Sequence, residues 1–258
     1  MSSSETIKDG IVENVKTIVY ALLIAGIFRS FFFQPFYIPS GSMKDTLLIG
    51  DFLFVNKMAY GYSAHSCPFS ACPISDRLFG KEPERGDVVV FRHPHNGQDY
   101  IKRLVGLPGD KVQMNDGVLY LNDVAQGQTR VEDFVEPFTT SYGYMGCVNG
   151  ATGLGGDCAK ERFDEDLEGH GPHSILNFGN SKLDNTKVFT VPEGNFFFVG
   201  DNRDNSVDSR ELPELGGVGY VPFSYLLGRA DRVMFSSAGA RMIFFWTWRS
   251  DRFFKAVE

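Results

Sequence analysis

Two short segments of the chain carry side chains that could act as a nucleophile and a base. The first, Phe36 to Met43, reads FYIPSGSM and offers Ser40 and Ser42. The second begins at Tyr100, reads YIKRLVGLPGD, and holds Lys102 inside an apolar run. A neutral lysine amine can take the proton of a serine hydroxyl, whose oxygen then attacks a carbonyl carbon. The two segments therefore favour acyl transfer through a serine, although Ser40 and Ser42 taken alone could simply form a turn.

The pattern around Lys102 indicates partial loss of hydration. If the run is a strand, alternation places Lys102 on the same face as Tyr100 and Leu104, with Arg103 on the opposite face. A solvated surface lysine is the alternative interpretation. Desolvation lowers the pKa of a lysine because it penalises the ammonium form. At the ordinary pKa of about 10.4 only about one lysine in 2,500 is neutral at pH 7. To lower the pKa to about 8, the site must destabilise the ammonium form relative to the neutral amine by about 3 kcal/mol.

A third segment is dense in charges of both signs and directly follows the apolar run NFFFV at 195–199. It reads GDNRDNSVDSR from Gly200 onward. Its charges form two pairs around Ser206, namely Asp201 with Arg203 and Asp208 with Arg210. Such a segment could be a solvated loop, but it also suits a loop held by ion pairs and hydrogen bonds.

Other catalytic chemistries find less support. The five histidines make no H-E-x-x-H pattern. His93 and His95, which flank Pro94, are interpreted as a polar turn after a strand rather than as metal ligands. No histidine follows a strand in a way that favours a His-based triad. Neither Ser40 nor Ser42 begins the S-x-x-K pattern of penicillin-binding enzymes.

The composition describes a globular chain rich in β-structure. The 258 residues are 43 % hydrophobic and 22 % charged, which excludes a disordered or collagen-like protein. The net charge of −7 and the lack of a basic cluster exclude nucleic acid as an expected partner. The chain holds 24 Phe, 28 Gly and 12 Pro, and this mixture of aromatic residues and turn formers favours strands and loops over a helix bundle.

Short apolar runs separated by turns predict a mostly antiparallel β domain. We expect strands over 51–56, 87–91, 100–105, 118–121 and 195–199. Asp116-Gly117, between 111–114 and 118–121, is a hairpin signal. Residues 124–190 are Gly-rich and acidic and predict an inserted lobe or long loops, in which 164–168 (DEDLE) is a solvated surface rather than a calcium loop. The aromatic stretch 242–254 suits either a membrane interface or an edge strand.

The cysteines lie in two loops. Cys67 and Cys72 share a Pro-rich loop, and Cys147 and Cys158 bracket a Gly-rich loop. Loop cysteines favour two disulfides in an oxidising compartment over buried thiols. Their pairing is left open by the sequence, but this usage places the chain after residue 36 on the oxidising side of a membrane.

An apolar segment near the N-terminus predicts a retained membrane anchor. Ile18 to Phe28 is continuously apolar or small, but eleven helical residues reach only about 17 Å. If Arg29 extends its side chain to the headgroups, Thr17 to Phe33 could serve as a short or tilted span. The rival is a cleavable signal peptide, which would need small residues where Phe28 and Arg29 stand. Positive charges lie on both sides and give no orientation.

These segments resemble the characteristic boxes of bacterial type I signal peptidases, or leader peptidases, which are membrane-anchored Ser/Lys endopeptidases. The matching stretches occur in the family's order: IPSGSM at 38–43, TLLIGDFLFVNKMAYG at 46–61, RGDVVVF at 85–91, YIKRLVGLPGD at 100–110 and GDNRDNSVDSR at 200–210. The resemblance implies a mostly β fold, with a coiled antiparallel catalytic core and an inserted lobe behind one N-terminal transmembrane helix. We assign a tail to 1–12, the anchor to 13–36 and the catalytic region to 37–258, with the inserted lobe at 114–192.

The resemblance also implies roles for individual residues. Ser42 matches the nucleophile and Lys102 the general base. Ser40 matches the serine that assists the oxyanion hole beside the Ser42 N–H, and Ser206 matches a serine that orients the lysine amine. Asp208 and Arg210 match a structural pair behind the site, and Asp201 and Arg203 are expected to shape the same loop.

The implied substrate is a preprotein signal peptide with the A-x-A pattern, cut through an acyl-enzyme intermediate. The walls of the pockets for its small side chains are expected from Phe36, Ile38, Met43, Leu47, Leu53, Tyr100 and Ile101, each of which could instead have a role in the core. No metal or cofactor is needed. The expected location is the bacterial inner (plasma) membrane, as a single-pass monomer in contact with the lipid bilayer, with the catalytic region on the periplasmic or extracytoplasmic side.

One departure from the family pattern follows the nucleophile. Lys44 and Asp45 precede Thr46 where the family usually has a variable residue and proline. Lys44 thereby offers a second amine, but in a polar turn beside Asp45 we expect it to stay protonated, so Lys102 remains the expected base.

Two other functions would use some of the same sequence features. A self-cleaving Ser/Lys regulator of the repressor type would carry a DNA-binding domain where this chain has an apolar segment. A non-catalytic, membrane-tethered β scaffold could bind extended peptides by strand addition. Labelling of Ser42 by an acylating reagent would separate the peptidase from the scaffold.

Overall fold

The computed structural model describes residues 3–67, 72–74, 76–138, 147–150, 153–177, 179, 181–239 and 244–258. Its helices are α1 (Ser3–Phe31) and the short 3-10 helices η1 (Lys57–Ala59), η2 (Ala64–Ser66), η4 (Arg203–Asn205), η5 (Pro213–Leu215), η6 (Phe223–Tyr225), η7 (Phe245–Thr247) and η8 (Ser250–Arg252). Its strands are β1 (Phe33–Tyr37), β2 (Asp51–Asn56), β3 (Val88–Arg92), β4 (Asp99–Gly106), β5 (Lys111–Asn115), β6 (Val118–Leu121), β7 (Val124–Ala125), β8 (Gly127–Arg130), β9 (Phe134–Pro137), β10 (Asp157–Lys160), β11 (Arg162–Leu167), β12 (Gly171–Leu176), β13 (Phe189–Thr190), β14 (Asn195–Val199), β15 (Val221–Pro222) and β16 (Leu226–Ser236).

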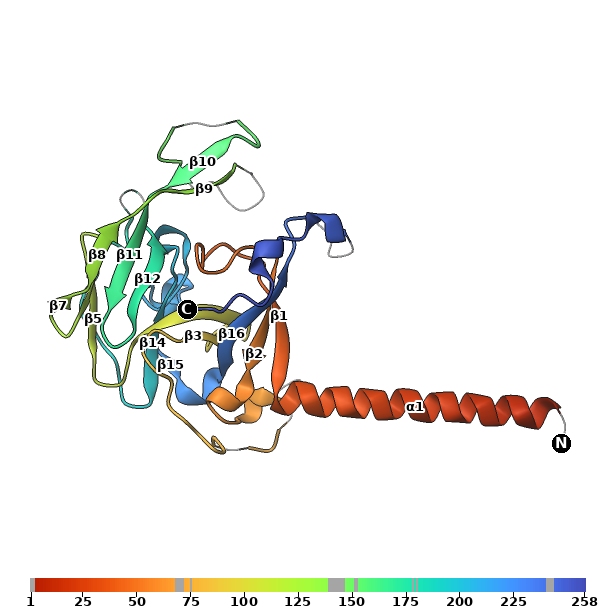
Figure 1. Ribbon diagram of the computed structural model, residues 1–258. Coiled ribbons are helices and arrows are strands. Elements are labelled where there is room, and N and C mark those ends of the chain that lie inside the picture. The colour runs from red at the N-terminus through yellow and green to blue at the C-terminus, as the bar shows by residue number, and fades with distance from the viewer. Residues whose placement is uncertain are drawn as a thin grey trace.

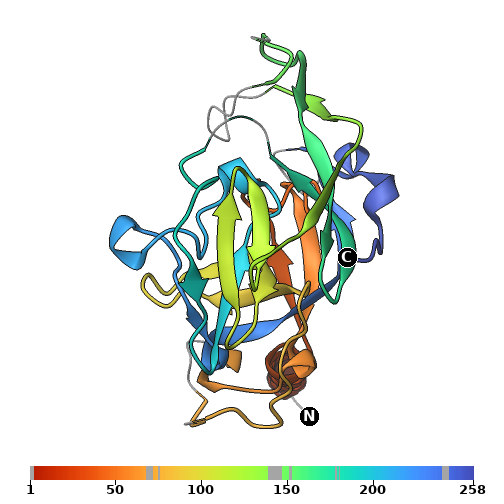
Figure 2. The ribbon, with the colours of Figure 1, turned by 90° about the vertical axis from the view of Figure 1, so that its left-hand side faces the viewer.

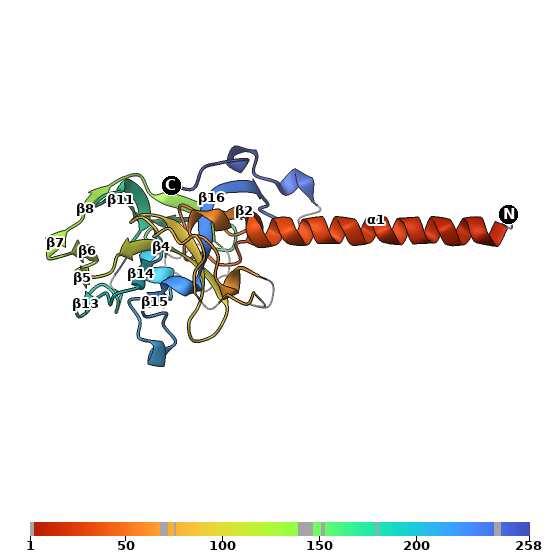
Figure 3. The same cartoon turned by 90° about the horizontal axis from the view of Figure 1, so that it is seen from below.

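Helix α1 projects away from the strands as one long rod (Figures 1 and 3). Its residues Gly10–Arg29 are long and apolar enough to cross a membrane, and at 1.5 Å per residue their 20 residues span about 30 Å. The helix begins earlier and ends earlier than the anchor expected at 13–36. It starts at Ser3, and Phe33–Tyr37 already form β1, because Pro35 cannot continue a helix and the pairing with β2 gives the backbone other partners.

The main sheet contains the strands that flank the Ser42 turn, the Lys102 segment and the charged segment at 200–210. In the described part of the chain its strand order is β1-β2-β16-β3-β4-β14-β15, and every pair is antiparallel. The expected strands at 51–56 and 195–199 are confirmed at those bounds, and those at 87–91, 100–105 and 118–121 to within one residue. The prediction of a mostly β antiparallel fold behind one N-terminal helix is therefore confirmed.

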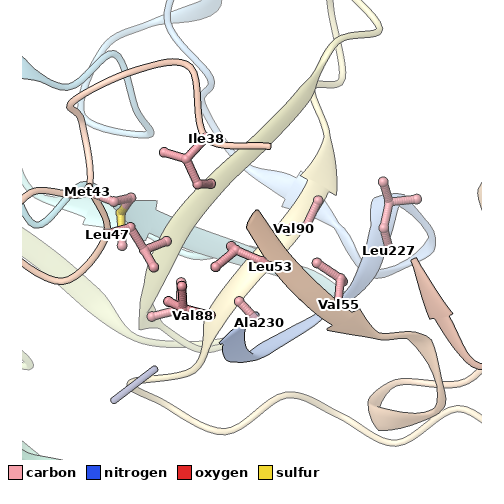
Figure 4. Packing of buried hydrophobic residues seen from close by; sticks show 10 residues of the cluster. Ile38, Met43, Leu47, Leu53, Val55, Val88, Val90, Leu227 and Ala230 are labelled. Atoms are coloured by element: carbon pink, nitrogen blue, oxygen red, sulfur yellow. The ribbon is translucent and has the colours of Figure 1, made fainter. Parts of the chain in front are cut away.

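The turn after β1 is anchored in the core by apolar side chains (Figure 4). Ile38, Met43 and Leu47 from this turn are almost fully buried. They pack in one cluster with Leu53 and Val90 of the sheet. Burial of each such side chain contributes about 1.5–3 kcal/mol, so the turn is fixed rather than free.

The expected hairpin around Asp116-Gly117 is present. Strands β5 and β6 pair through Met114 and Leu119, and both turn residues have positive φ, as such a turn requires. In Figure 2 this hairpin, in yellow-green, lies nearest the viewer in front of the main sheet. The region expected to be an inserted lobe also holds β8, β11 and β12 in one sheet and the pair β9–β10, which extends away from the rest (Figure 1).

The four cysteines pair within their own loops, Cys67 with Cys72 and Cys147 with Cys158. This confirms the prediction of two disulfides and settles the pairing that the sequence left open.

The aromatic C-terminal stretch divides between packing and exposure. The ring of Trp248 stacks on Phe235 of β16 at 5.1 Å, which is contact with the sheet. Phe245 and Trp246 instead project outward and are largely exposed. The described part of 242–254 forms η7 and η8 and no strand, so the edge-strand alternative is wrong, although Trp248 does pack on the sheet. The membrane-interface alternative stays a prediction, and residues 242 and 243 lie outside the described residues.

Candidate active site

Ser42 and Lys102 meet in the structure. Lys102 Nζ lies 2.6 Å from Ser42 Oγ and also donates a hydrogen bond to the carbonyl oxygen of Ile101 at 3.0 Å. Both side chains are buried. A hydroxyl and an amine at this distance can exchange a proton directly, which is the first requirement of a serine nucleophile.

The sheet explains why these two residues meet. Strands β1 and β4 are four positions apart in the strand order, about 19 Å across a flat sheet. The curl of the sheet and the anchored turn at 38–47 bring Ser42 back over β4. Strand β14 neighbours β4, with Val199 opposite Arg103, so the charged segment that follows β14 also lies beside Lys102.

Burial lowers the pKa of Lys102 to about 8. The side chain is only 4 % exposed, and loss of hydration is the main cause. The charges of Asp208 and Asp201 act in the opposite direction, and that of Arg210 adds to the lowering. At this pKa about one molecule in ten holds a neutral amine at pH 7, compared with about one in 2,500 for an ordinary lysine.

The backbone of the turn is held by Asn202. Its N–H donates to the carbonyl oxygen of Ser42 at 3.1 Å, and its side-chain amide donates to the carbonyl oxygen of Gly41 at 2.9 Å. The N–H of Leu47 closes the turn by donating to the carbonyl oxygen of Met43 at 2.7 Å. Ser42 therefore stands on a backbone that is fixed from both sides.

Ser40 and Ser206 flank the pair. Ser40 Oγ lies 3.4 Å from Ser42 Oγ, and Ser40 is exposed to the cleft. Ser206 is buried, and its hydroxyl forms no hydrogen bond of normal geometry within the described residues. A Cβ on Gly200 would stand 2.2 Å from Ser206 Oγ and 2.6 Å from the Ser42 carbonyl oxygen, so only glycine lets these segments approach.

Ion pairs hold the loop behind the site. Arg210 donates twice to the carboxylate of Asp208, which also accepts the Gly200 N–H at 3.0 Å. Burial alone would raise the pKa of Asp208, but the Arg210 charge and these hydrogen bonds outweigh it and lower the pKa. Both side chains are almost fully enclosed, which fits the structural position expected for them.

Asp201 and Arg203, the other two charged residues considered in this loop, each form an ion pair with a residue outside it. Asp201 binds the guanidinium of Arg103 from β4 through both carboxylate oxygens, at 2.9 and 2.8 Å. Arg203 instead pairs with Glu165 of β11. Alternation correctly placed Arg103 on the face opposite Lys102. The burial of Arg103 could not be predicted from the strand pattern, because it depends on the ion pair with Asp201, which lies far away in the sequence.

Lys44 and Asp45 lie differently from the polar turn that the sequence suggested. Lys44 is buried, and its Nζ donates to Glu136 of β9 at 2.5 Å. Burial lowers the pKa of Lys44, and the ion pair with Glu136 opposes this effect. Asp45 accepts hydrogen bonds from Arg162 and Ser174, at 3.0 and 3.1 Å. The correction has a simple reason: strands β9 to β12 cover the turn, and the sequence gives no sign of that contact.

A cleft of about 390 Å³ opens beside Ser42 and Lys102. Four of the seven expected wall residues line it: Phe36, Ile38, Tyr100 and Ile101. Met43, Leu47 and Leu53 do not line it, because they point into the core cluster beneath the turn. The cleft also has walls that the sequence did not suggest, namely Tyr37, Pro39, Val90, Gln98, Asp99, Asn205 and Val207.

His93 and His95 share one turn after β3. His93 sits in the turn after β3, where its Nδ1 accepts the N–H groups of His95 and Asn96. This is the polar turn that the sequence indicated. Across the described ranges, no three His, Cys, Asp or Glu side chains are grouped in a way that could hold a metal ion.

The sequence is similar to those of known peptidases. Residues 11–235 match the family model described as signal peptidase, peptidase S26. Signal peptidase I of Rickettsia typhi (strain ATCC VR-144 / Wilmington) is 40 % identical over 229 residues, 84 % of this chain and 78 % of that protein. Signal peptidase I of Rickettsia prowazekii (strain Madrid E) is 37 % identical over 248 residues, 92 % of this chain and 83 % of that protein. A crystal structure of a signal peptidase I from Enterococcus faecalis V583 has 26 % identity and a TM-score of 0.31, and covers 58 % of this chain and 97 % of that one.

Proposed function

The chain belongs to the signal peptidase family, peptidase S26, and from this premise we propose that it removes signal peptides from preproteins with Ser42 as nucleophile and Lys102 as general base. The observation that carries the proposal is the distance of 2.6 Å between Lys102 Nζ and Ser42 Oγ, in a buried site beside an open cleft. The lowered pKa of Lys102 supports the same assignment, since the base must be neutral to accept a proton.

The reaction follows in two steps. Ser42 Oγ attacks the scissile carbonyl carbon while its proton passes to Lys102 Nζ, and the C–N bond then breaks as the leaving amine takes that proton. The acyl group remains on Ser42 as an ester. A water molecule then gives a proton to Lys102 Nζ as its oxygen attacks the carbonyl carbon of the ester. The bond between that carbon and Ser42 Oγ breaks, Ser42 Oγ takes the proton back from Lys102, and the product leaves as a carboxylic acid that loses its proton to water.

Ser40 and Ser206 are proposed to support these steps. Ser40 lies close enough to Ser42 for its hydroxyl to donate to the developing oxyanion beside the Ser42 N–H, and one such donor is typically worth about 3–4 kcal/mol. The hydroxyl of Ser206 is buried beside Asp208, and we assign it the role of orienting the amine of Lys102. Asp208 and Arg210 keep the loop of Ser206 in place.

The cleft suits an extended peptide with small side chains. Its walls are mainly apolar, and Ile38, Tyr100 and Ile101 stand near the reacting groups. We therefore assign the small-x-small specificity, with A-x-A as its typical form, to this cleft. All these groups come from one chain, so a monomer suffices. Helix α1 would hold the cleft at the extracytoplasmic surface of the inner (plasma) membrane, where a signal peptide leaves the bilayer.

The test uses the full chain in detergent, a synthetic preprotein with an A-x-A site, and no added metal. We expect cleavage by the wild type and a loss on the order of 10⁴-fold or more in Ser42→Ala and in Lys102→Met. The circular dichroism spectra of both variants should stay unchanged. An acylating serine reagent should label Ser42 in the wild type. A wild type that neither cleaves nor is labelled would instead be a peptide-binding scaffold.

A further inference from the structure

A second cleft lies where α1 meets the β-domain. It has a volume of about 140 Å³, and its polar lining consists of Arg29, Gln34, Lys57, His65, Arg92 and Asp99. We call it the anchor-base pocket. Arg29 belongs to the last turn of α1, Lys57 opens η1 directly after β2, and Arg92 and Asp99 end β3 and begin β4. Apart from Asp99, which also lines the substrate cleft, none of these side chains belongs to the proposed site of peptide cleavage.

The anchor-base pocket carries an excess of positive charge. Its single carboxylate, Asp99, pairs with Arg92 at 2.7 Å. Among the residues that the structure describes, neither Arg29 nor Lys57 has a carboxylate within ion-pairing distance. The pocket therefore holds the cations Arg29, Lys57 and Arg92 against the single carboxylate of Asp99, an excess of two positive charges that an entering anion would offset.

Lys57 is the buried cation of the anchor-base pocket. Its side chain is 2 % exposed, and its Nζ donates to the carbonyl oxygen of Ser66 at 2.5 Å. An ammonium group has three donors, so donors remain for a ligand. The pKa of Lys57 is lowered to about 8, first by burial and then by the charge of Arg29, whereas Asp99 raises it too little to compensate. An anion in the pocket would remove this unfavourable repulsion.

The position of the pocket relative to the membrane indicates which anion could bind in it. Gly10–Arg29 is the part of α1 able to cross a membrane, and Arg29 is its last residue. The pocket therefore lies at the level of the lipid headgroups, whose phosphates gather just outside the hydrocarbon core. We propose that the anchor-base pocket binds a phosphate group, supplied by a phospholipid headgroup at the membrane surface. Asp99 lines both this pocket and the substrate cleft, so the two cavities are neighbours.

The test is native mass spectrometry of the full chain in detergent with added dioleoylphosphatidylglycerol. Arg29→Gln is the informative variant, because Arg29 is exposed and its loss breaks no described ion pair. Lys111→Gln removes one positive charge from β5, at the far end of the molecule from α1 (Figure 1), and is the control; it breaks only an exposed ion pair with Asp123. We expect Arg29→Gln to retain about fivefold less lipid than the wild type, and Lys111→Gln to retain as much as the wild type.

A second arm separates the two possible sources of the phosphate group. Lipid-free protein is heated in inorganic phosphate and in chloride of equal ionic strength. A higher melting temperature in phosphate for the wild type, but not for Arg29→Gln, supports the phosphate site and shows that the free ion also binds. Lipid retention without such a rise supports the lipid as the sole source. Equal lipid retention by all three proteins together with no phosphate effect, or equal loss in both variants, would overturn the proposal.

Discussion

Lys44 Nζ lies 2.5 Å from Glu136 Oε2, and the other oxygen of this carboxylate accepts a hydrogen bond from Lys160 at 2.6 Å. The amine that is nearest to Ser42 in sequence is therefore occupied by a carboxylate on β9. Lys102, which is 60 positions from Ser42, reaches its hydroxyl instead.

This relationship predicts that Lys44 is dispensable for proton transfer. Lys44→Met should keep cleavage within about tenfold of the wild type, since it removes only a contact between the turn and β9. Lys102→Met should lose cleavage altogether. The measurement is kcat/KM on a synthetic preprotein, with Glu136→Gln as a companion that breaks the same ion pair from the other side. Retained cleavage in Lys102→Met with loss in Lys44→Met would transfer the base to Lys44.

The pH dependence of cleavage should report the titration of Lys102. Its amine must be neutral to act as a base, so activity rises as pH increases and levels off above the pKa of about 8. At pH 6 about 1 % of the amine is neutral, so kcat/KM there should be about a hundredfold below the plateau. The profile is measured on the free enzyme with dilute substrate. A limb near the ordinary pKa of histidine that disappears on changing His93 would point to a triad instead.

Removal of the Ser206 hydroxyl should affect catalysis more than binding. In Ser206→Ala we expect kcat to fall by about 10–100-fold with little change in KM, because the amine of Lys102 loses a group that orients it. The midpoint of the pH profile should move as well, which a purely structural role would not cause. Thermal unfolding serves as the control, since this hydroxyl forms no hydrogen bond of normal geometry in the described residues. An unchanged kcat and midpoint would contradict the assigned role.

The buried pair of Asp208 and Arg210 should be important for stability. Arg210→Met leaves a buried carboxylate without its partner and should lower the free energy of unfolding by about 3–5 kcal/mol, measured in urea at neutral pH. Lys81→Met, which removes a lysine from an exposed pair with Glu84, should change it by less than about 1 kcal/mol.

The same pair sets a pH dependence of stability. The pKa of Asp208 is lowered in the folded protein, so the unfolded chain binds more protons as the pH falls. The contribution of the pair is complete above the ordinary carboxylate pKa and is lost below it. The difference between the wild type and Arg210→Met should therefore shrink in acid. A difference that is small at neutral pH would show that water reaches Asp208.

Local patterns were sufficient for most of the elements. The alternation in 51–56 predicts a half-buried strand, and Leu53 and Val55 are indeed buried there. The Asp116-Gly117 signal predicts its hairpin because few residues other than these accept positive φ at low cost. The end of α1 was harder to predict, since Phe32 and Phe33 suit a helix or a strand equally well. In the structure the pairing of β1 with β2 makes Phe33 the first residue of a strand.

The amino-acid sequence by itself determined that an apolar N-terminal segment precedes a mostly β chain, because apolar periodicity and turn residues act over a few positions. Only the tertiary structure decided that Lys102 faces Ser42, that Lys44 is bound to Glu136, and that Met43 belongs to the core rather than to the cleft. The physical reason is that burial and ion pairing depend on which distant strand covers a residue, and that follows from the curl of the sheet and the packing of the lobe.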